Sequence, residues 1–79
     1  MDVRSRIRAY FDTAIVESIN DDEDIFEGRY VDSMFALQLV TFVEEEFSIV
    51  VEREDLDIQN FVSVSAITSF VESKLATSR

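Results

Sequence analysis

The chain has 79 residues, including 17 acidic and 7 basic ones, no cysteine and no histidine, and its formal net charge is −10. This composition excludes disulfides, thiolate metal sites and histidine-based catalysis, and the negative charge argues against a nucleic-acid partner. A disordered acidic chain is excluded too, because 47% of the residues are hydrophobic and seven are phenylalanines.

A first helix is predicted over residues 3 to 19, followed by an apolar loop. Its inward face has apolar residues at 3.6-residue spacing, namely Val3, Ile7, Tyr10, Phe11 and Ala14. Three arginines lie in its first turns, where the helix dipole disfavours cations, so we expect them to pair with acids elsewhere on the surface. The stretch NDDED (20–24) ends the helix, and the loop after it is expected to pack over the core through Ile25, Phe26, Tyr30 and Val31.

The rest of the chain is also predicted to be mainly helical. A second helix covers residues 33 to 47, a short one lies within 52 to 60, and SIVV (48–51) between them is β-branched enough to be extended. Ser63 is expected to cap a last helix. The apolar stripe of that helix comprises Val64, Ile67, Phe70 or Val71, and Leu75. The predicted architecture is all-α, a small four-helix bundle with three main helices and one short helix.

The second helix has two distinct faces when its residues are placed about 100° apart around the axis. The core face comprises Ala36, Leu39, Val40, Val43 and Phe47, with Phe35 and Phe42 on its flank. The solvent face comprises Gln38, Thr41, Glu44 and Glu45. Met34 and Leu37 fall on this polar face, where they either form a docking spot or are covered by the preceding loop.

The pair Asp32–Ser33 begins this helix. Either side chain is suited to accept a backbone N–H as a helix cap, but Phe35 and Ala36 stand where a capping box needs Glu or Gln. Ser33 lacks the base and the GxSxG turn of a serine hydrolase, so no catalytic residue is predicted. The pair is therefore either a structural cap or a place where another protein attaches a group, since a helix start favours a phosphate.

The stretch DSMFALQLVTFVEEEF (32–47) resembles the attachment motif and recognition helix of acyl carrier proteins and peptidyl carrier proteins. The resemblance extends through LDIQNFVSVSAITSFV (56–71). It implies a four-helix bundle with a covalent 4′-phosphopantetheine arm on Ser33, added from coenzyme A by a phosphopantetheinyl transferase that uses Mg²⁺. It further implies that the thiol of the arm holds acyl or aminoacyl groups as thioesters, and that the chain is a carrier rather than an enzyme.

The resemblance also implies roles for the residues near Ser33. Asp32 is expected to orient the transferase. A docking strip for partner enzymes is expected from Met34, Leu37, Gln38, Thr41, Glu44 and Glu45. The two glutamates are expected to meet basic residues of these partners. The expected partners are the transferase, an acyl- or aminoacyl-loading enzyme, tailoring enzymes and a downstream synthase.

A finer resemblance is to discrete carrier proteins of specialised metabolism. Tyr30 stands where fatty-acid carrier proteins usually have glycine, and Met34 replaces the usual leucine. The stretch GRYVDSMFALQLVTFVEEEF (28–47) is most similar to carriers in polyketide and antibiotic biosynthesis that bear unusual extender units, such as hydroxymalonyl, methoxymalonyl or aminomalonyl groups. Two alternatives stay open: an aminoacyl carrier of the D-alanyl or peptidyl type, and an unmodified acidic helical adaptor.

No metal, membrane or secretion feature is predicted. The run DDED (21–24) lacks the ligand spacing of an EF-hand loop. No apolar run approaches the ~18 residues of a membrane span, and the N-terminal MDVRSRIRAY lacks the apolar stretch of a secretion signal. We therefore expect a monomeric cytoplasmic protein with one free-standing domain over residues 1–79.

Overall fold

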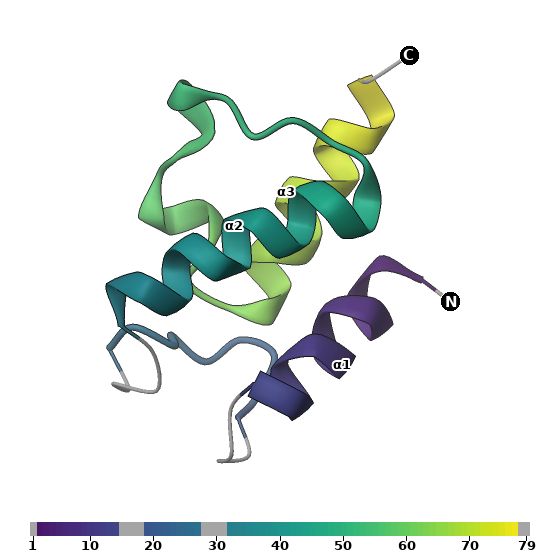
Figure 1. Ribbon diagram of the computed structural model, residues 1–79. Coiled ribbons are helices and arrows are strands. Elements are labelled where there is room, and N and C mark those ends of the chain that lie inside the picture. Colours follow the sequence, from purple (N-terminus) through teal and green to yellow (C-terminus); the bar gives the residue numbers. More distant parts are fainter. Residues whose placement is uncertain (1, 15–18, 28–31, 78–79) are drawn as a thin grey trace.

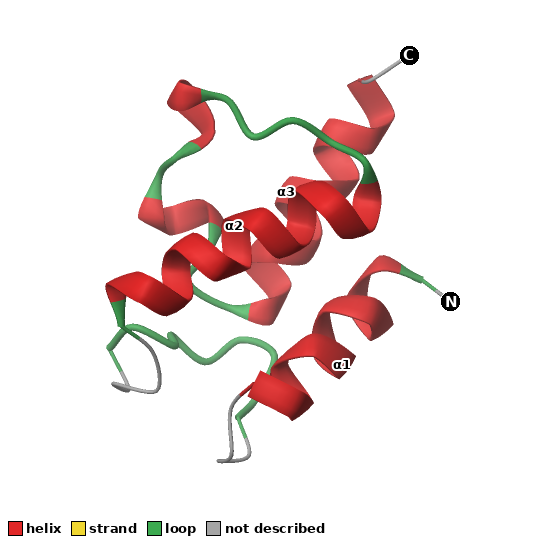
Figure 2. Ribbon diagram, viewed as in Figure 1, coloured by secondary structure: helices red, strands yellow, loops and turns green. Residues whose placement is uncertain are grey.

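The computed structural model describes residues 2–14, 19–27 and 32–77. It contains three α-helices, α1 (Val3–Ala14), α2 (Ser33–Phe47) and α3 (Val64–Thr77), and two short 3₁₀ turns, η1 (Arg53–Asp55) and η2 (Ile58–Asn60) (Figures 1 and 2). The described ranges contain no strand, so the all-α prediction is confirmed and SIVV is not part of a sheet. The predicted count of four helices is not confirmed, because two separate turns stand in place of one short helix.

The first helix ends earlier than predicted. Its last described helical residue is Ala14, residues 15–18 lie outside the described ranges, and Ile19 is not helical. Ile7 and Phe11 are fully buried as expected, whereas Ala14 is exposed. The prediction was wrong for Ala14 and Ile19: Ala14 lies at the last turn, and Ile19 reaches the core from the following loop.

Aromatic rings join α1 to α2. The rings of Tyr10 and Phe42 stack with their centroids 4.1 Å apart, and the rings of Phe11 and Phe35 meet edge to face at 5.9 Å. Such ring pairs add to the stability that burial of apolar area supplies. Both flanking phenylalanines of α2 therefore belong to the packed interior, as the helical-wheel placement predicts.

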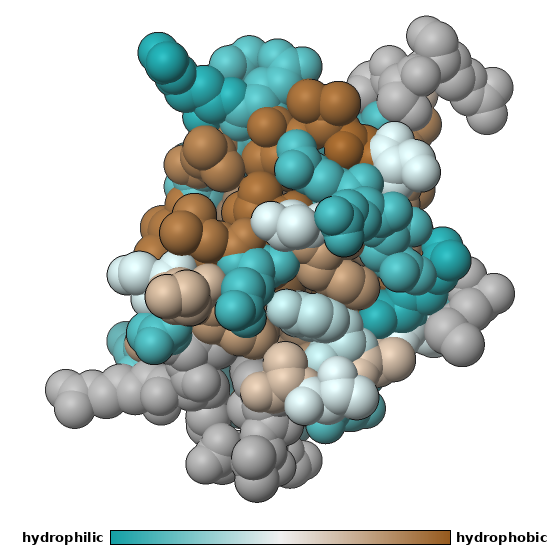
Figure 3. All heavy atoms as spheres, viewed as in Figure 1, coloured by the Kyte–Doolittle hydropathy of each residue, from teal (hydrophilic) through white to brown (hydrophobic). Residues whose placement is uncertain are grey.

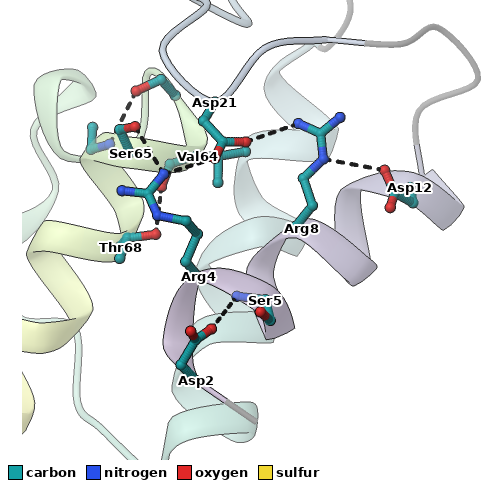
Figure 4. A network of polar contacts seen from close by, with 11 residues as sticks. Asp2, Arg4, Ser5, Arg8, Asp12, Asp21, Val64, Ser65 and Thr68 are labelled. Atoms are coloured by element: carbon teal, nitrogen blue, oxygen red, sulfur yellow. Dashed lines mark hydrogen bonds and ion pairs between the residues drawn. The ribbon is translucent and has the colours of Figure 1, made fainter.

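A polar network holds the loop after α1 against α1 and α3 (Figure 4). The carboxylate of Asp21 accepts hydrogen bonds from Arg4 and Arg8 at 2.8 and 3.2 Å. The backbone carbonyl of Asp21 accepts one from the N–H of Ser65, at the start of α3. The third arginine, Arg6, pairs with Glu46 of α2 at 3.0 Å. The expected pairing of the arginines with distant acids is confirmed.

The loop between α1 and α2 packs over the core through Ile25, which is fully buried. The N–H of Ile25 donates to the carbonyl of Val62 at 2.8 Å, and Phe26 is half-buried beside it. This confirms the expected packing for these two residues, while Tyr30 and Val31 lie outside the described ranges. Within those ranges no group of acids is arranged to hold a metal ion.

The cap and stripe of α3 are largely as predicted. The hydroxyl of Ser63 accepts the N–H of Ala66 at 3.0 Å, which is the expected N-cap bond. The inward residues Val64, Ile67, Phe70 and Val71 are all buried. Leu75 was expected in the same stripe but is exposed, because the last turn of α3 extends beyond the rest of the bundle (Figure 1). No helix among the described residues is long and apolar enough to cross a bilayer.

Candidate functional site

The side chain of Asp32, and not that of Ser33, supplies the N-cap bond of α2. One carboxylate oxygen of Asp32 accepts the N–H of Phe35 at 3.0 Å, and its backbone carbonyl accepts the N–H of Ala36. Ser33 is the first residue of the helix, and its side chain is exposed. Its hydroxyl makes no hydrogen bond within the described part of the chain. Of the two roles weighed for the pair, the cap therefore belongs to Asp32, and Ser33 presents an exposed hydroxyl.

The predicted docking residues of the first two turns face solvent. The side chains of Met34 and Leu37 are 65% and 70% exposed, so no described part of the preceding loop covers them. Gln38, Thr41 and Glu45 are exposed as well. Met34 and Leu37 thus place two exposed apolar side chains near Ser33 on an otherwise polar face of α2.

Glu44 departs from its predicted place on the solvent face. Its side chain is half-buried, and one carboxylate oxygen accepts the N–H of Val51 at 2.9 Å. The chain reverses direction at Ser48, whose left-handed backbone (φ 55°) ends α2 and brings residues 49–51 back toward it. Glu44 therefore fastens the following segment to α2, whereas Glu45 is exposed.

We call residues 50–60, which include both 3₁₀ turns, the strap. Lys74 of α3 donates to the carboxylate of Asp55 at 2.7 Å, and the side-chain amide of Asn60 donates to the carbonyl of Asp55 at 2.9 Å. The hydrogen bond from Lys74 lowers the pKa of Asp55, and the same bond raises the pKa of Lys74. No side chain of the strap is buried, so these polar contacts and the Val51 bond hold it in place.

An open groove of about 670 Å³ lies between α2 and the strap. We call it the Ser33 groove. Its apolar lining comprises Phe26, Ala36, Leu37, Val40, Leu56, Ile58 and Phe61, and its polar lining comprises Asp32, Ser33 and Asp57. Figure 3 shows hydrophobic atoms gathered where α2 and the strap lie on this face. Ser33 thus stands beside an apolar hollow rather than on a featureless surface.

The strap side of the groove was not predicted. Leu56 and Ile58 are exposed large hydrophobic residues, and Asp57 lies between them. One sequence feature could have indicated this wall: the otherwise polar stretch EREDLDIQN (52–60) contains two large apolar residues. Such residues are usually buried, so the pair needs an explanation. The sequence does not show that they face the start of α2.

The chain is 34% identical over 53 residues to the D-alanyl carrier protein of Streptococcus mutans, and the match covers 65% of this chain and 67% of that protein. The chain belongs to the carrier protein family. No protein-family model matches this carrier protein. Carrier proteins are generally not catalysts, which fits a chain without histidine or cysteine. The name of that relative specifies an amino acid as its cargo. The match therefore gives no support to the finer resemblance to extender-unit carriers.

Proposed function

We propose that this carrier protein holds an amino acid as a thioester on a 4′-phosphopantetheine arm attached to Ser33. The observation that carries the proposal is the exposed Ser33 hydroxyl, which has no hydrogen bond within the described residues, at the start of a helix that Asp32 already caps. Modification of Ser33 would leave the helix cap in place. We also propose that residues 1–79 form one carrier domain.

The residues around Ser33 fit such an arm. A phosphodiester at the first residue of α2 would face the partial positive charge of the helix start. The Ser33 groove offers apolar surface beside the hydroxyl, and its lining includes exposed Leu37. When bound, the arm supplies the thiol that this chain lacks. No described residue is placed to activate Ser33, so a separate transferase is required.

The aminoacyl cargo is preferred over a polyketide extender unit. The D-alanyl carrier protein of Streptococcus mutans supports this choice, since its name specifies an amino acid. The differences from fatty-acid carriers at Tyr30 and Met34 are compatible with either cargo. The proposed partners are a phosphopantetheinyl transferase, an amino-acid-loading enzyme and an enzyme that accepts the amino acid.

We propose that these partners dock on the exposed face of α2. Met34 and Leu37 supply apolar contact, while Gln38, Thr41 and Glu45 supply the polar surround. Asp32 lies next to the hydroxyl that the transferase must reach. Glu44 is given no docking role, because its carboxylate holds the strap.

The first test is an intact-mass measurement. The protein and its Ser33→Ala variant are incubated with coenzyme A, Mg²⁺ and a promiscuous phosphopantetheinyl transferase. We expect one phosphopantetheine on the wild-type protein and none on the variant. If the folded wild-type protein gains no mass, the proposal is wrong, and an unmodified acidic adaptor becomes the better interpretation.

The second test concerns the cargo. The modified protein is offered D-alanine, ATP and a D-alanine-activating enzyme, and in parallel malonyl-type groups with an acyltransferase. We expect a mass increase from the amino acid. Loading by malonyl-type groups alone would instead support the extender-unit interpretation.

A further inference from the structure

The lining of the Ser33 groove carries negative charge. Among the described residues that line it, the charged ones are Asp32 and Asp57, and both are acidic. The chain as a whole has a net charge of −10, which is of the same sign. A cationic group would therefore be attracted into the groove and an anionic group would be repelled from it.

Asp57 is the carboxylate best placed to meet a ligand in the groove. It lies on the strap side, between the exposed hydrophobic residues Leu56 and Ile58. One of its oxygens accepts the N–H of Gln59 at 2.9 Å, which fixes the side chain at the start of η2. The carboxylate can accept further hydrogen bonds, because each of its two oxygens has more than one acceptor site.

We infer that Asp57, which lines the groove beside Ser33, meets the cargo at the end of the arm and favours cargo with a protonated amino group over cargo with a free carboxylate. This inference rests on the proposed function, and it adds a residue that determines specificity. The occupant follows from charge complementarity and from position, since Ser33 itself lines the groove that Asp57 also lines. The apolar walls suit a short aliphatic side chain such as the methyl group of alanine.

The charge argument separates the two classes of cargo. An α-amino group has an ordinary pKa of about 8, so it is mostly protonated near neutral pH. A malonyl-type group carries a carboxylate at the same pH and would stand against Asp57 with like charge. Contacts between a single exposed carboxylate and an ammonium group are modest, so the expected effect is a preference rather than an absolute selection.

The experiment compares cargo groups that differ by one functional group. Amide-linked alanyl and propionyl analogues of the arm, which resist hydrolysis, are transferred to Ser33 from the corresponding coenzyme A analogues. The alanyl analogue is the propionyl analogue with an amino group added. The pKa of that amino group is measured by NMR titration on the wild-type protein, and backbone amide shifts are compared between the two loaded forms.

Two variants with the same change in net charge distinguish the local effect of Asp57 from the effect of the protein's overall negative charge. Asp57→Asn keeps an oxygen that accepts the N–H of Gln59, so η2 is retained. Glu54→Gln removes an exposed acid of η1 that does not line the groove, and it serves as the matched control.

We expect the pKa of the alanyl amino group to be about half a unit higher in the wild-type protein and in Glu54→Gln than in Asp57→Asn. We also expect the alanyl and propionyl forms to differ most at the amides of residues 57–60. Equal pKa values in Asp57→Asn and the wild-type protein would overturn the inference, as would identical amide shifts for the two cargo groups. Failure of Ser33 to take up either analogue, visible by mass, would instead overturn the proposed function.

Discussion

The ammonium group of Lys74 lies 2.7 Å from the carboxylate of Asp55, and this ion pair joins the strap to α3. The two side chains are only 23% and 21% exposed, which makes the pair the most shielded of the ion pairs among the described residues. Shielding matters because exposed pairs contribute little to stability. No side chain of the strap is buried, so the position of the strap, which forms one wall of the Ser33 groove, depends strongly on this ion pair.

The Asp55–Lys74 pair predicts a pH-dependent stability. The pKa of Asp55 is lowered, so its contribution is complete above its ordinary value of 3.8 and is lost as pH falls through the lowered value. The pKa of Lys74 is raised, so its contribution is complete below 10.5 and is lost as pH rises through the raised value. Asp55→Asn should therefore unfold more easily than the wild-type protein at pH 7, with a difference that shrinks as the pH falls below 3.8 and through the lowered pKa of Asp55.

Chemical unfolding at a series of pH values checks this prediction. Glu54→Gln is the control, because Glu54 lies in the same 3₁₀ turn and is exposed. The difference between the control and the wild-type protein should vary much less with pH. A difference for Asp55→Asn that stays constant down to about pH 2 would contradict the assigned role of the pair.

Substitutions at the start of α2 should separate stability from modification. Asp32→Ala removes the N-cap bond to Phe35 and should lower the free energy of unfolding by about 1 kcal/mol. Ser33→Ala removes no hydrogen bond within the described residues and should change that free energy by less than about 0.5 kcal/mol. Urea unfolding measures both values. A larger loss for Ser33→Ala than for Asp32→Ala would reverse the assignment of the cap.

Phe42→Ala should destabilise the fold by about 2–3 kcal/mol. The ring is half-buried, stacks on Tyr10 at 4.1 Å and meets Phe47 edge to face at 6.1 Å. The expected loss is at the lower end of the range for buried phenylalanines, because part of the ring already contacts water. Thermal and urea unfolding give the value, and an unchanged melting temperature would contradict the packing between α1 and α2.

Ser48→Gly should stabilise the protein by up to about 1 kcal/mol. Ser48 has φ 55° and ψ 45°, a left-handed conformation that disfavours every residue with a Cβ atom. Ser69→Gly is the matched control, since Ser69 is an exposed serine within α3, where glycine should destabilise by about 0.5 kcal/mol. Loss of stability in both variants would mean that the left-handed backbone at residue 48 is not strained.

Glu45→Lys should slow association with the transferase or the loading enzyme, and the effect should weaken as salt is added. Glu45 is exposed on the docking face of α2. Glu72→Lys is the control, because Glu72 is exposed on α3 and the net charge changes by the same amount. Stopped-flow binding measures both rates. Equal effects of the two substitutions would indicate general charge attraction instead of a docking role.

Much of the fold follows from local patterns in the sequence. The bounds of α2 were predicted because Asp32 offers a cap and the apolar arc of the helix is continuous to Phe47. The cap of α3 was predicted for the same kind of reason. The end of α1 was not, because apolar residues such as Ile19 continue the pattern past the last helical turn and enter the core from a loop.

The site was predictable only on the α2 side. Ser33 and the exposed Met34 and Leu37 follow from a motif and from the position of each residue around one helix. The hydrogen bond between Glu44 and Val51 depends on the reversal of the chain at Ser48, which no local sequence pattern predicts. The groove depends likewise on a contact between segments that are distant in sequence, so its strap wall became visible only in the structure.

The absence of buried side chains in the strap has a consequence for how such carriers diverge. A substitution within residues 52–60 can change the shape or charge beside Ser33 without opening a cavity in the core. The polar contacts of Asp55 are the part that must persist for the wall to keep its position. The strap residues that line the groove and the residues that form the buried core are therefore separate sets, so the groove wall can be altered by design while the core is preserved.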